Sequence, residues 1–197
     1  MRITLANELQ KWLATGEVLE RDSHGPKVVR LEDGRFLKIF RSRRPLIARL
    51  RPEAKRFSRN AECLQALNIA TPKIFECVWI QRDRGVSACI YLPLEGTGLD
   101  KLFATERKRF NDLLPQFAAY IRKLHQNGIY FRSLHLGNVL LLPDDEFGLI
   151  DFLDLKFKRR PLNKNLVRRN FAHLKSYLNR RKIENFPLEE LISLYEG

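Results

Sequence analysis

Residues 130–141 read YFRSLHLGNVLL and residues 149–154 read LIDFLD, and these two stretches give the strongest structural signal in the sequence. Each contains a short apolar run, and Pro143-Asp144-Asp145-Glu146 between the runs is typical of a turn, so the sequence predicts a β-hairpin. This hairpin brings Asn138 and Asp151 near each other. Because Mg²⁺ takes a few protein oxygens and fills its octahedron with phosphate and water, the pair suits a magnesium–phosphate site. The structural alternatives are a turn residue for Asn138 and a buried hydrogen-bonded residue for Asp151.

Helices are predicted on both sides of this hairpin. An apolar stripe at helical spacing runs from Phe110 to Leu124, and Asn127-Gly128 supplies its stop signal. Pro115 within the stripe predicts that the helix begins late or is kinked. After the hairpin, apolar residues at helical spacing in residues 162–181 predict a basic amphipathic helix.

The first half of the chain is rich in predicted strands. Residues 27–31 and 35–40 are β-rich runs joined by a turn with Asp33-Gly34, and residues 74–80 and 87–92 form a second pair. One helix is predicted between the two pairs, beginning at Pro52. The sequence therefore predicts an α+β fold with a β-rich lobe at residues 1–92 and a short helical lobe at residues 93–197.

Composition narrows the class of protein. Cys63, Cys77 and Cys89 are odd in number and lack metal-ligand spacing, which favours reduced thiols in the cytosol. The first twenty residues contain no apolar core of a signal peptide, and no stretch approaches the roughly 20 apolar residues that span a bilayer. We expect a cytoplasmic protein.

The formal charge of +13 arises from 36 Lys and Arg against 23 Asp and Glu. The excess is clustered, since residues 156–182 hold eleven basic residues and no acidic one. Such a field attracts polyanions: nucleic acid, the anionic inner membrane face or a phosphorylated glycolipid. The alternative is a solvated basic surface. Nucleic acid is disfavoured as a partner because no recognised binding motif accompanies the charge.

The loop sequence SLHLGNVLL resembles the catalytic loop DLHPGNIL of aminoglycoside and small-molecule kinases, and LIDF resembles their metal-binding segment. Over about residues 27–177 the chain resembles the lipopolysaccharide core kinases, in particular the small group called toluene tolerance proteins. The segments RFSRNAECLQALNIATP, IYFRSLHLGNVLL and RRPLNKNLVRRNFAHL carry this resemblance. It implies the bilobal protein-kinase-like fold.

The resemblance also implies roles for individual residues. Asn138 and Asp151 take the metal-ligand positions, and Lys38 takes that of the lysine that binds the α- and β-phosphates of ATP. Glu62, or alternatively Glu53, takes the position of the helix glutamate that pairs with this lysine. The hinge segment with Leu92 and Leu94, which flank Pro93, is the expected adenine contact. The implied cofactors are ATP and Mg²⁺.

Two departures from the family pattern concern catalysis. Ser133 occupies the position of the aspartate that accepts the proton of the substrate hydroxyl, a contribution worth about 10²–10⁴-fold. The loop expected to cover the nucleotide, residues 21–27, has one glycine, Gly25, and is a poor phosphate cradle. His135, two residues after Ser133, and Asp154, three residues after Asp151, are the candidates to replace the missing base.

The resemblance implies ATP-dependent phosphotransfer to an anionic glycolipid or sugar such as the lipopolysaccharide core, with weak or atypical activity. Phosphoryl transfer depends mostly on positioning and charge neutralisation, so loss of the base need not abolish it. The alternative is a pseudokinase, a binding or scaffold module without turnover. Either protein would be cytoplasmic, or peripheral at the inner membrane.

Overall fold

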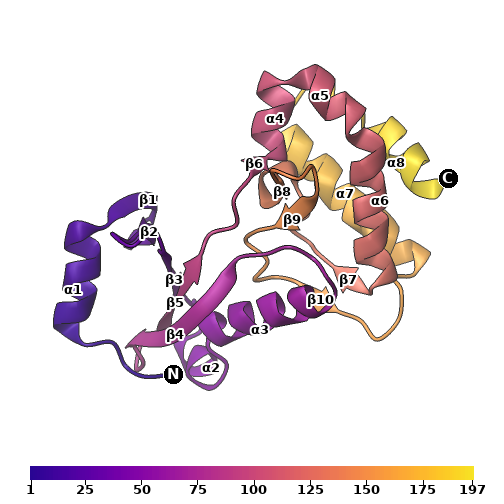
Figure 1. Ribbon diagram of the computed structural model, residues 1–197. Coiled ribbons are helices and arrows are strands. Elements are labelled where there is room, and N and C mark those ends of the chain that lie inside the picture. The colour runs from indigo at the N-terminus through magenta and orange to yellow at the C-terminus, as the bar shows by residue number, and fades with distance from the viewer. The chain divides into compact units, whose positions relative to one another are not determined.

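The computed structural model describes residues 1–197 and divides into two compact units, Met1–Leu94 and Glu95–Gly197 (Figure 1). The fold class is α+β, as predicted, and the five-stranded antiparallel sheet with its helices is consistent with a kinase-like fold. None of the helices has the length and apolar character needed to cross a bilayer.

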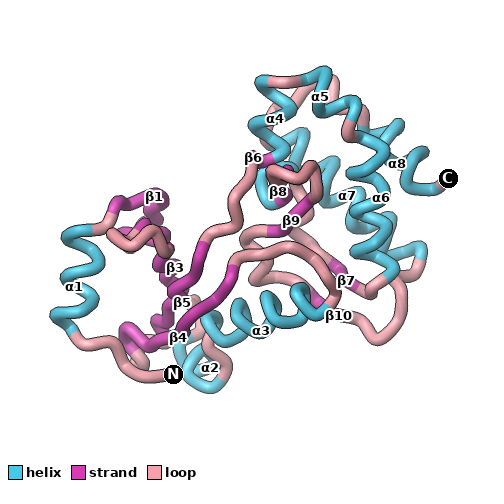
Figure 2. The backbone as a smooth tube through the Cα atoms, viewed as in Figure 1, coloured by secondary structure: helices cyan, strands magenta, loops and turns pink.

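The first unit is built on an antiparallel sheet with the strand order β1-β2-β3-β5-β4 (Figure 2). The strands are β1 (Glu17–Asp22), β2 (Gly25–Arg30), β3 (Phe36–Arg41), β4 (Lys73–Gln81) and β5 (Val86–Leu92). The helices are α1 (Ala6–Thr15), α2 (Pro45–Leu50) and α3 (Glu53–Ala66). Both predicted hairpins, β2–β3 and β4–β5, are present, and Gly34 adopts the positive φ of 80° that the first turn requires.

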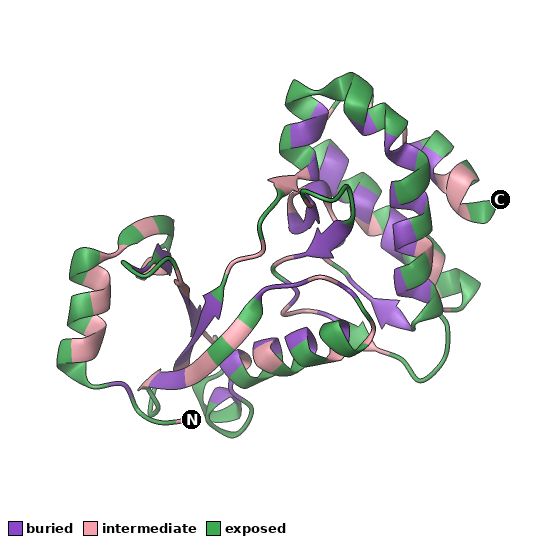
Figure 3. Cartoon of the chain, viewed as in Figure 1, coloured by how far each residue is buried: buried purple, intermediate pink, exposed green.

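Alternation along β3 gives the sheet two apolar faces. Leu37 and Ile39 belong to a buried cluster against which Leu9 and Trp12 of α1 pack. The intervening side chains point to the other face, since successive residues of a strand alternate. On that face the ring of Phe57, from α3, lies 5.4 Å from the ring of Phe40. Figure 3 shows the result on α3, where buried and exposed positions alternate around the helix.

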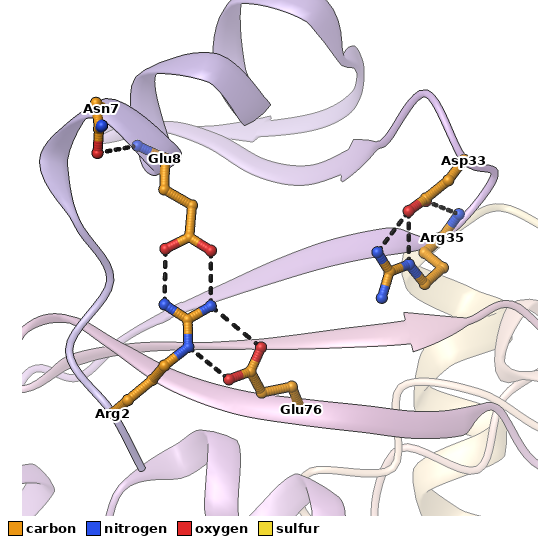
Figure 4. Close-up of polar contacts among 6 residues, drawn as sticks. All are labelled: Arg2, Asn7, Glu8, Asp33, Arg35 and Glu76. Atoms are coloured by element: carbon orange, nitrogen blue, oxygen red, sulfur yellow. Dashed lines mark hydrogen bonds and ion pairs between the residues drawn. The ribbon is translucent and has the colours of Figure 1, made fainter.

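Polar contacts near the N-terminus join α1 to the edge strand β4. The Arg2 guanidinium donates to both carboxylate oxygens of Glu8, in α1, at 2.7 and 2.6 Å, and to Glu76, in β4, at 2.7 and 3.3 Å (Figure 4). Each exposed ion pair adds little to the free energy of unfolding. The main effect of this network is therefore to hold α1 against β4. Neither α1 nor α2 was expected from the sequence. The helical stripe of α1 is only partly buried, and Ala48 is the single buried residue of α2.

The second unit contains most of the helices. They are α4 (Leu99–Thr105), α5 (Arg107–Asp112), α6 (Leu114–Gln126), α7 (Lys164–Arg180) and α8 (Leu188–Glu196). Its short strands form the sheets β6-β8-β9 and β10-β7. Their bounds are β6 (Thr97–Gly98), β7 (Ile129–Tyr130), β8 (Val139–Leu141), β9 (Phe147–Leu149) and β10 (Lys156–Phe157).

The predicted interruption at Pro115 and the predicted hairpin are both present. α5 ends at Asp112 and α6 begins at Leu114 with the proline in its first turn, where the missing N–H costs nothing. The hairpin pairs Val139 with Leu149 in antiparallel register. The basic helix predicted over residues 162–181 is α7, which buries Phe171, Leu174 and Leu178.

Candidate active site

Side chains of two helices fix the start of the loop at residues 131–138. Asn170 of α7 is 1% exposed, and its amide nitrogen donates to the Phe131 carbonyl at 2.7 Å. The amide oxygen of Asn170 lies 2.9 Å from Nε2 of His125, which belongs to α6. Because buried polar groups are costly unless paired, this chain of bonds ties the loop to the helical core.

Asn138 and Asp151 are adjacent across the hairpin. Beyond the last ladder pair, the Ile150 N–H donates to the Asn138 carbonyl at 3.0 Å, so Asp151 is the next residue along the returning chain. Asp151 is exposed and has a φ of 50°, a left-handed conformation that non-glycine residues seldom adopt. Such backbone conformations cluster at functional sites.

The donor set of this pair fits Mg²⁺. The side-chain nitrogen of Asn138 donates to the Ser133 carbonyl at 3.1 Å, which leaves the amide oxygen for a ligand. An amide oxygen and a carboxylate are hard oxygen donors of the type that Mg²⁺ takes alongside phosphate oxygens and water. No group of three or more His, Cys, Asp or Glu residues is placed to hold a metal ion.

Ser133 is hydrogen-bonded to a carboxylate from a different segment. Its hydroxyl donates to Oδ2 of Asp154 at 2.8 Å. The second carboxylate oxygen, Oδ1, is buried and has no hydrogen-bond partner. The carboxylate that the loop lacks at position 133 is therefore present beside it.

His135 packs flat against Tyr177 of α7, with ring centroids 4.3 Å apart and an interplanar angle of 9°. Its Nδ1 is buried without a hydrogen-bond partner. Burial lowers the pKa of His135 below its usual value, although Asp151 and Asp100 oppose the shift. The lowered pKa favours the neutral imidazole.

Lys38 lies in the middle of β3 and is 7% exposed. It is paired in register with Cys89 of β5 and Val28 of β2. The Lys38 side chain is therefore buried in the sheet and is not a solvent-exposed surface lysine.

The predicted partner of Lys38 is on a different side of α3. Glu62 is exposed, and its carboxylate accepts a hydrogen bond from Ser58 at 3.1 Å. Glu53 is 3.8 Å from Arg56. The α3 side chain over which the Lys38 ammonium lies is Phe57, with Nζ 5.4 Å from the ring centroid. Phe57 is thus a residue of α3 that contacts Lys38, whereas the contacts of Glu62 and Glu53 described above are made within α3.

Two other predicted segments differ in extent or environment. The loop expected at residues 21–27 is a tight hairpin turn, because Asp22 and Gly25 are already paired in the β1–β2 ladder. Gly25 has a φ of 111°, and the His24 N–H donates to Asp22 at 2.7 Å. At the predicted hinge, Leu92 ends β5 and is 46% exposed, while Leu94 is the last residue of the first unit.

Asp100 is a residue of this region that sequence reasoning missed. It lies in the first turn of α4, and a Cβ added at Gly137 would be 3.1 Å from its Oδ2. Glycine at position 137 therefore lets the carboxylate approach the loop backbone closely. No sequence signal links the two residues, since they are 37 positions apart in elements with no common motif.

Comparison with known proteins agrees with the kinase-like interpretation of this region. No curated protein matches the chain. The model of the lipopolysaccharide kinase (Kdo/WaaP) family matches residues 34–195 and so includes β3, the loop, the β8–β9 hairpin and α7. Since this match covers most of the 197 residues, the chain belongs to the lipopolysaccharide kinase (Kdo/WaaP) family.

Proposed function

We propose that the chain transfers the γ-phosphate of ATP to a hydroxyl group of an anionic glycolipid or sugar, such as the lipopolysaccharide core. Membership of a lipopolysaccharide kinase family supports a kinase-like phosphotransferase that acts on a sugar or glycolipid. The observation that carries the proposal is the backbone bond from Ile150 to Asn138, which brings two oxygen donors to one end of the hairpin.

In this proposal each residue has a separate task. Asn138 and Asp151 hold Mg²⁺, which when bound neutralises phosphate charge during transfer. Lys38 binds phosphate oxygens through its ammonium group. Leu92 and Leu94 contact the adenine ring from the segment around Pro93. His135, neutral and stacked on Tyr177, shapes the loop beside the transferred phosphate.

A groove in the second unit supports an amphiphilic acceptor. It has a volume of about 1000 Å³ and is bordered by α6, α7 and α8. Its apolar lining residues are Leu162, Val167, Phe171, Ala172, Leu188 and Ile192, and its basic ones are Arg122, Lys164, Arg168 and Lys175. Glu189 and Glu196 also line the groove. Apolar walls with more basic than acidic side chains suit an acyl chain that carries an anionic headgroup, at the cytoplasmic face of the inner membrane.

A phosphate-transfer assay tests the proposed function. The chain is incubated with radiolabelled ATP, Mg²⁺ and dephosphorylated core oligosaccharide, and the labelled product is counted. We expect transfer by the wild-type chain and loss of at least 10²-fold in Asp151→Ala, because a metal ligand is removed. Equal turnover by the two proteins would overturn the proposal.

A pseudokinase is the second candidate function, and Ser133 in place of the loop aspartate favours it. The two candidates differ in turnover and not in nucleotide binding. A rise in melting temperature with MgATP, without any transfer or hydrolysis, would identify the pseudokinase.

A further inference from the structure

The hydrogen bond between Ser133 and Asp154 joins residues 21 positions apart in the sequence. Ser133 occupies the loop position at which related kinases carry a carboxylate, and Asp154 follows the β8–β9 hairpin. The bond length of 2.8 Å is typical of a hydroxyl that donates to a carboxylate. The Ser133 hydroxyl therefore points its proton at Asp154, which leaves its lone pairs available to another donor.

A cavity of about 230 Å³ opens on this pair. Ser133 and Asp154 line it together with Arg132, His173 and Arg180. Oδ1 of Asp154 is buried and has no hydrogen-bond partner. An unpaired buried oxygen of a carboxylate is costly, and such exceptions call for a functional explanation.

We propose, as an extension of the phosphotransfer function proposed above, that Asp154 acts through Ser133 as the proton acceptor for the attacking hydroxyl group. Ser133 contacts the acceptor, and Asp154 receives the proton. The carboxylate lost from the loop is supplied from a segment that packs against it. In this proposal the chain is an active phosphotransferase whose catalytic base is Asp154 and not a residue at position 133.

The step balances as follows. The acceptor oxygen forms a bond to the γ-phosphorus, and the bond from that phosphorus to the β–γ bridging oxygen breaks, so ADP leaves with the electron pair. The acceptor proton passes to Oγ of Ser133, while the serine proton passes along the 2.8 Å bond to Oδ2 of Asp154. Serine ends the step as a neutral hydroxyl, and Asp154 releases its proton to solvent.

His135 is less suited to this task than Asp154. The His135 ring is stacked on Tyr177. Of the two candidate bases, Asp154 is the one that Ser133 contacts by a hydrogen bond. Arg132 and Arg180, at the edge of the same cavity, favour an anionic acceptor there and so concentrate its hydroxyl groups near Ser133.

Four variants test the inference in the oligosaccharide transfer assay. Asp154→Asn retains an oxygen that accepts from Ser133, so the fold is kept while the proton acceptor is lost. Ser133→Ala removes the relay. The double variant Ser133→Asp/Asp154→Asn returns a carboxylate to the loop. Asp112→Asn, at the exposed end of α5, is the matched control for the loss of one negative charge.

We expect kcat to fall about 10²–10⁴-fold in Asp154→Asn and in Ser133→Ala, with the KM for ATP unchanged. The double variant should recover at least tenfold over Asp154→Asn, which a purely structural role of Asp154 would not produce. The MgATP-induced rise in melting temperature should be the same in all five proteins, the wild type included.

The assay distinguishes failure of this inference from failure of the proposed function. Wild-type turnover that Asp154→Asn leaves within twofold overturns this inference alone. A folded double variant no more active than Asp154→Asn also overturns it. Absence of turnover in the wild type, with either oligosaccharide or water as acceptor, overturns both the proposed function and this inference.

Discussion

The ammonium nitrogen of Lys38 lies 5.4 Å from the centre of the Phe57 ring, so α3 meets this buried lysine with an aromatic face. A cation over an aromatic ring gains about 0.5–2 kcal/mol from attraction to the negative face of the ring. In the proposed function this ammonium binds phosphate oxygens.

Lys38→Met should abolish the rise in melting temperature that MgATP produces, because the phosphate-binding charge is lost. Lys55→Met, in the exposed part of α3, is the control and should respond like the wild type. Phe57→Leu keeps an apolar side chain under the ammonium and should weaken ATP binding only a few-fold. An undiminished shift in Lys38→Met would show that nucleotide binds without this residue.

The groove bordered by α6, α7 and α8 predicts binding to anionic membranes. Each basic residue near an anionic surface contributes about 1 kcal/mol, so Lys164→Glu/Arg168→Glu should weaken binding by tenfold or more. Co-sedimentation with phosphatidylcholine vesicles, with and without phosphatidylglycerol, measures this. Arg82→Glu/Arg84→Glu, in the β4–β5 turn, changes the net charge equally and should bind almost as well as the wild type. Equal losses in both double variants would indicate a diffuse charge effect with no role for the groove.

The thiols of Cys77 and Cys89 face each other on β4 and β5, with sulfurs 3.2 Å apart. The hydrogen bond with Cys89 lowers the pKa of Cys77, which favours its thiolate. We expect oxidised glutathione to convert this pair to a disulfide by exchange, with release of two molecules of reduced glutathione per chain.

Mass spectrometry after alkylation should then find Cys63 as the one remaining reactive thiol. Cys63→Ser should form the same disulfide, and Cys77→Ser should not. Mixed disulfides distributed over all three cysteines would contradict the prediction.

His125 predicts how stability depends on pH. Its ring is 3% exposed and is held by Asn170 at 2.9 Å and by the Tyr195 hydroxyl at 3.0 Å, so it is a buried bridge and not a cap of α6. Burial lowers the pKa of His125 in the folded chain. The unfolded chain then binds the proton more readily, and the free energy of unfolding falls as the pH drops below about 6.5.

Urea unfolding at a series of pH values measures this slope. His125→Gln retains polar atoms at the site and should be less stable at pH 7.5 but less sensitive to acid. His24→Gln, an exposed histidine, is the control and should keep the wild-type slope. The same slope in all three proteins would assign the acid sensitivity to other groups.

Much of the fold follows from local sequence signals. The Asp33-Gly34 turn, the interruption at Pro115 and the 139–149 hairpin are each determined by residues within a few positions of one another. α1 was not predicted because its helical conformation depends on tertiary packing. Its stripe of Leu9, Trp12 and Leu13 packs against the sheet.

The candidate site was less predictable because it depends on rotation about helix axes and on long-range contacts. Phe57, Ala61 and Leu64 form one buried stripe of α3, and Glu62 is rotated about 100° from Ala61 around the helix axis. The bond from Ser133 to Asp154 had no comparable signal. It depends on how the chain returns after β9, which no local pattern specifies.

The loop and the returning segment are joined at two places, by the bond from Ile150 to the Asn138 carbonyl and by the bond from Ser133 to Asp154. Because the loop is bonded to the returning segment at both of its ends, a shift of one segment also shifts the other. Residues 133–138 and 150–154 should consequently exchange their amide hydrogens as one cooperative unit, and a ligand that stiffens either segment will stiffen its neighbour as well.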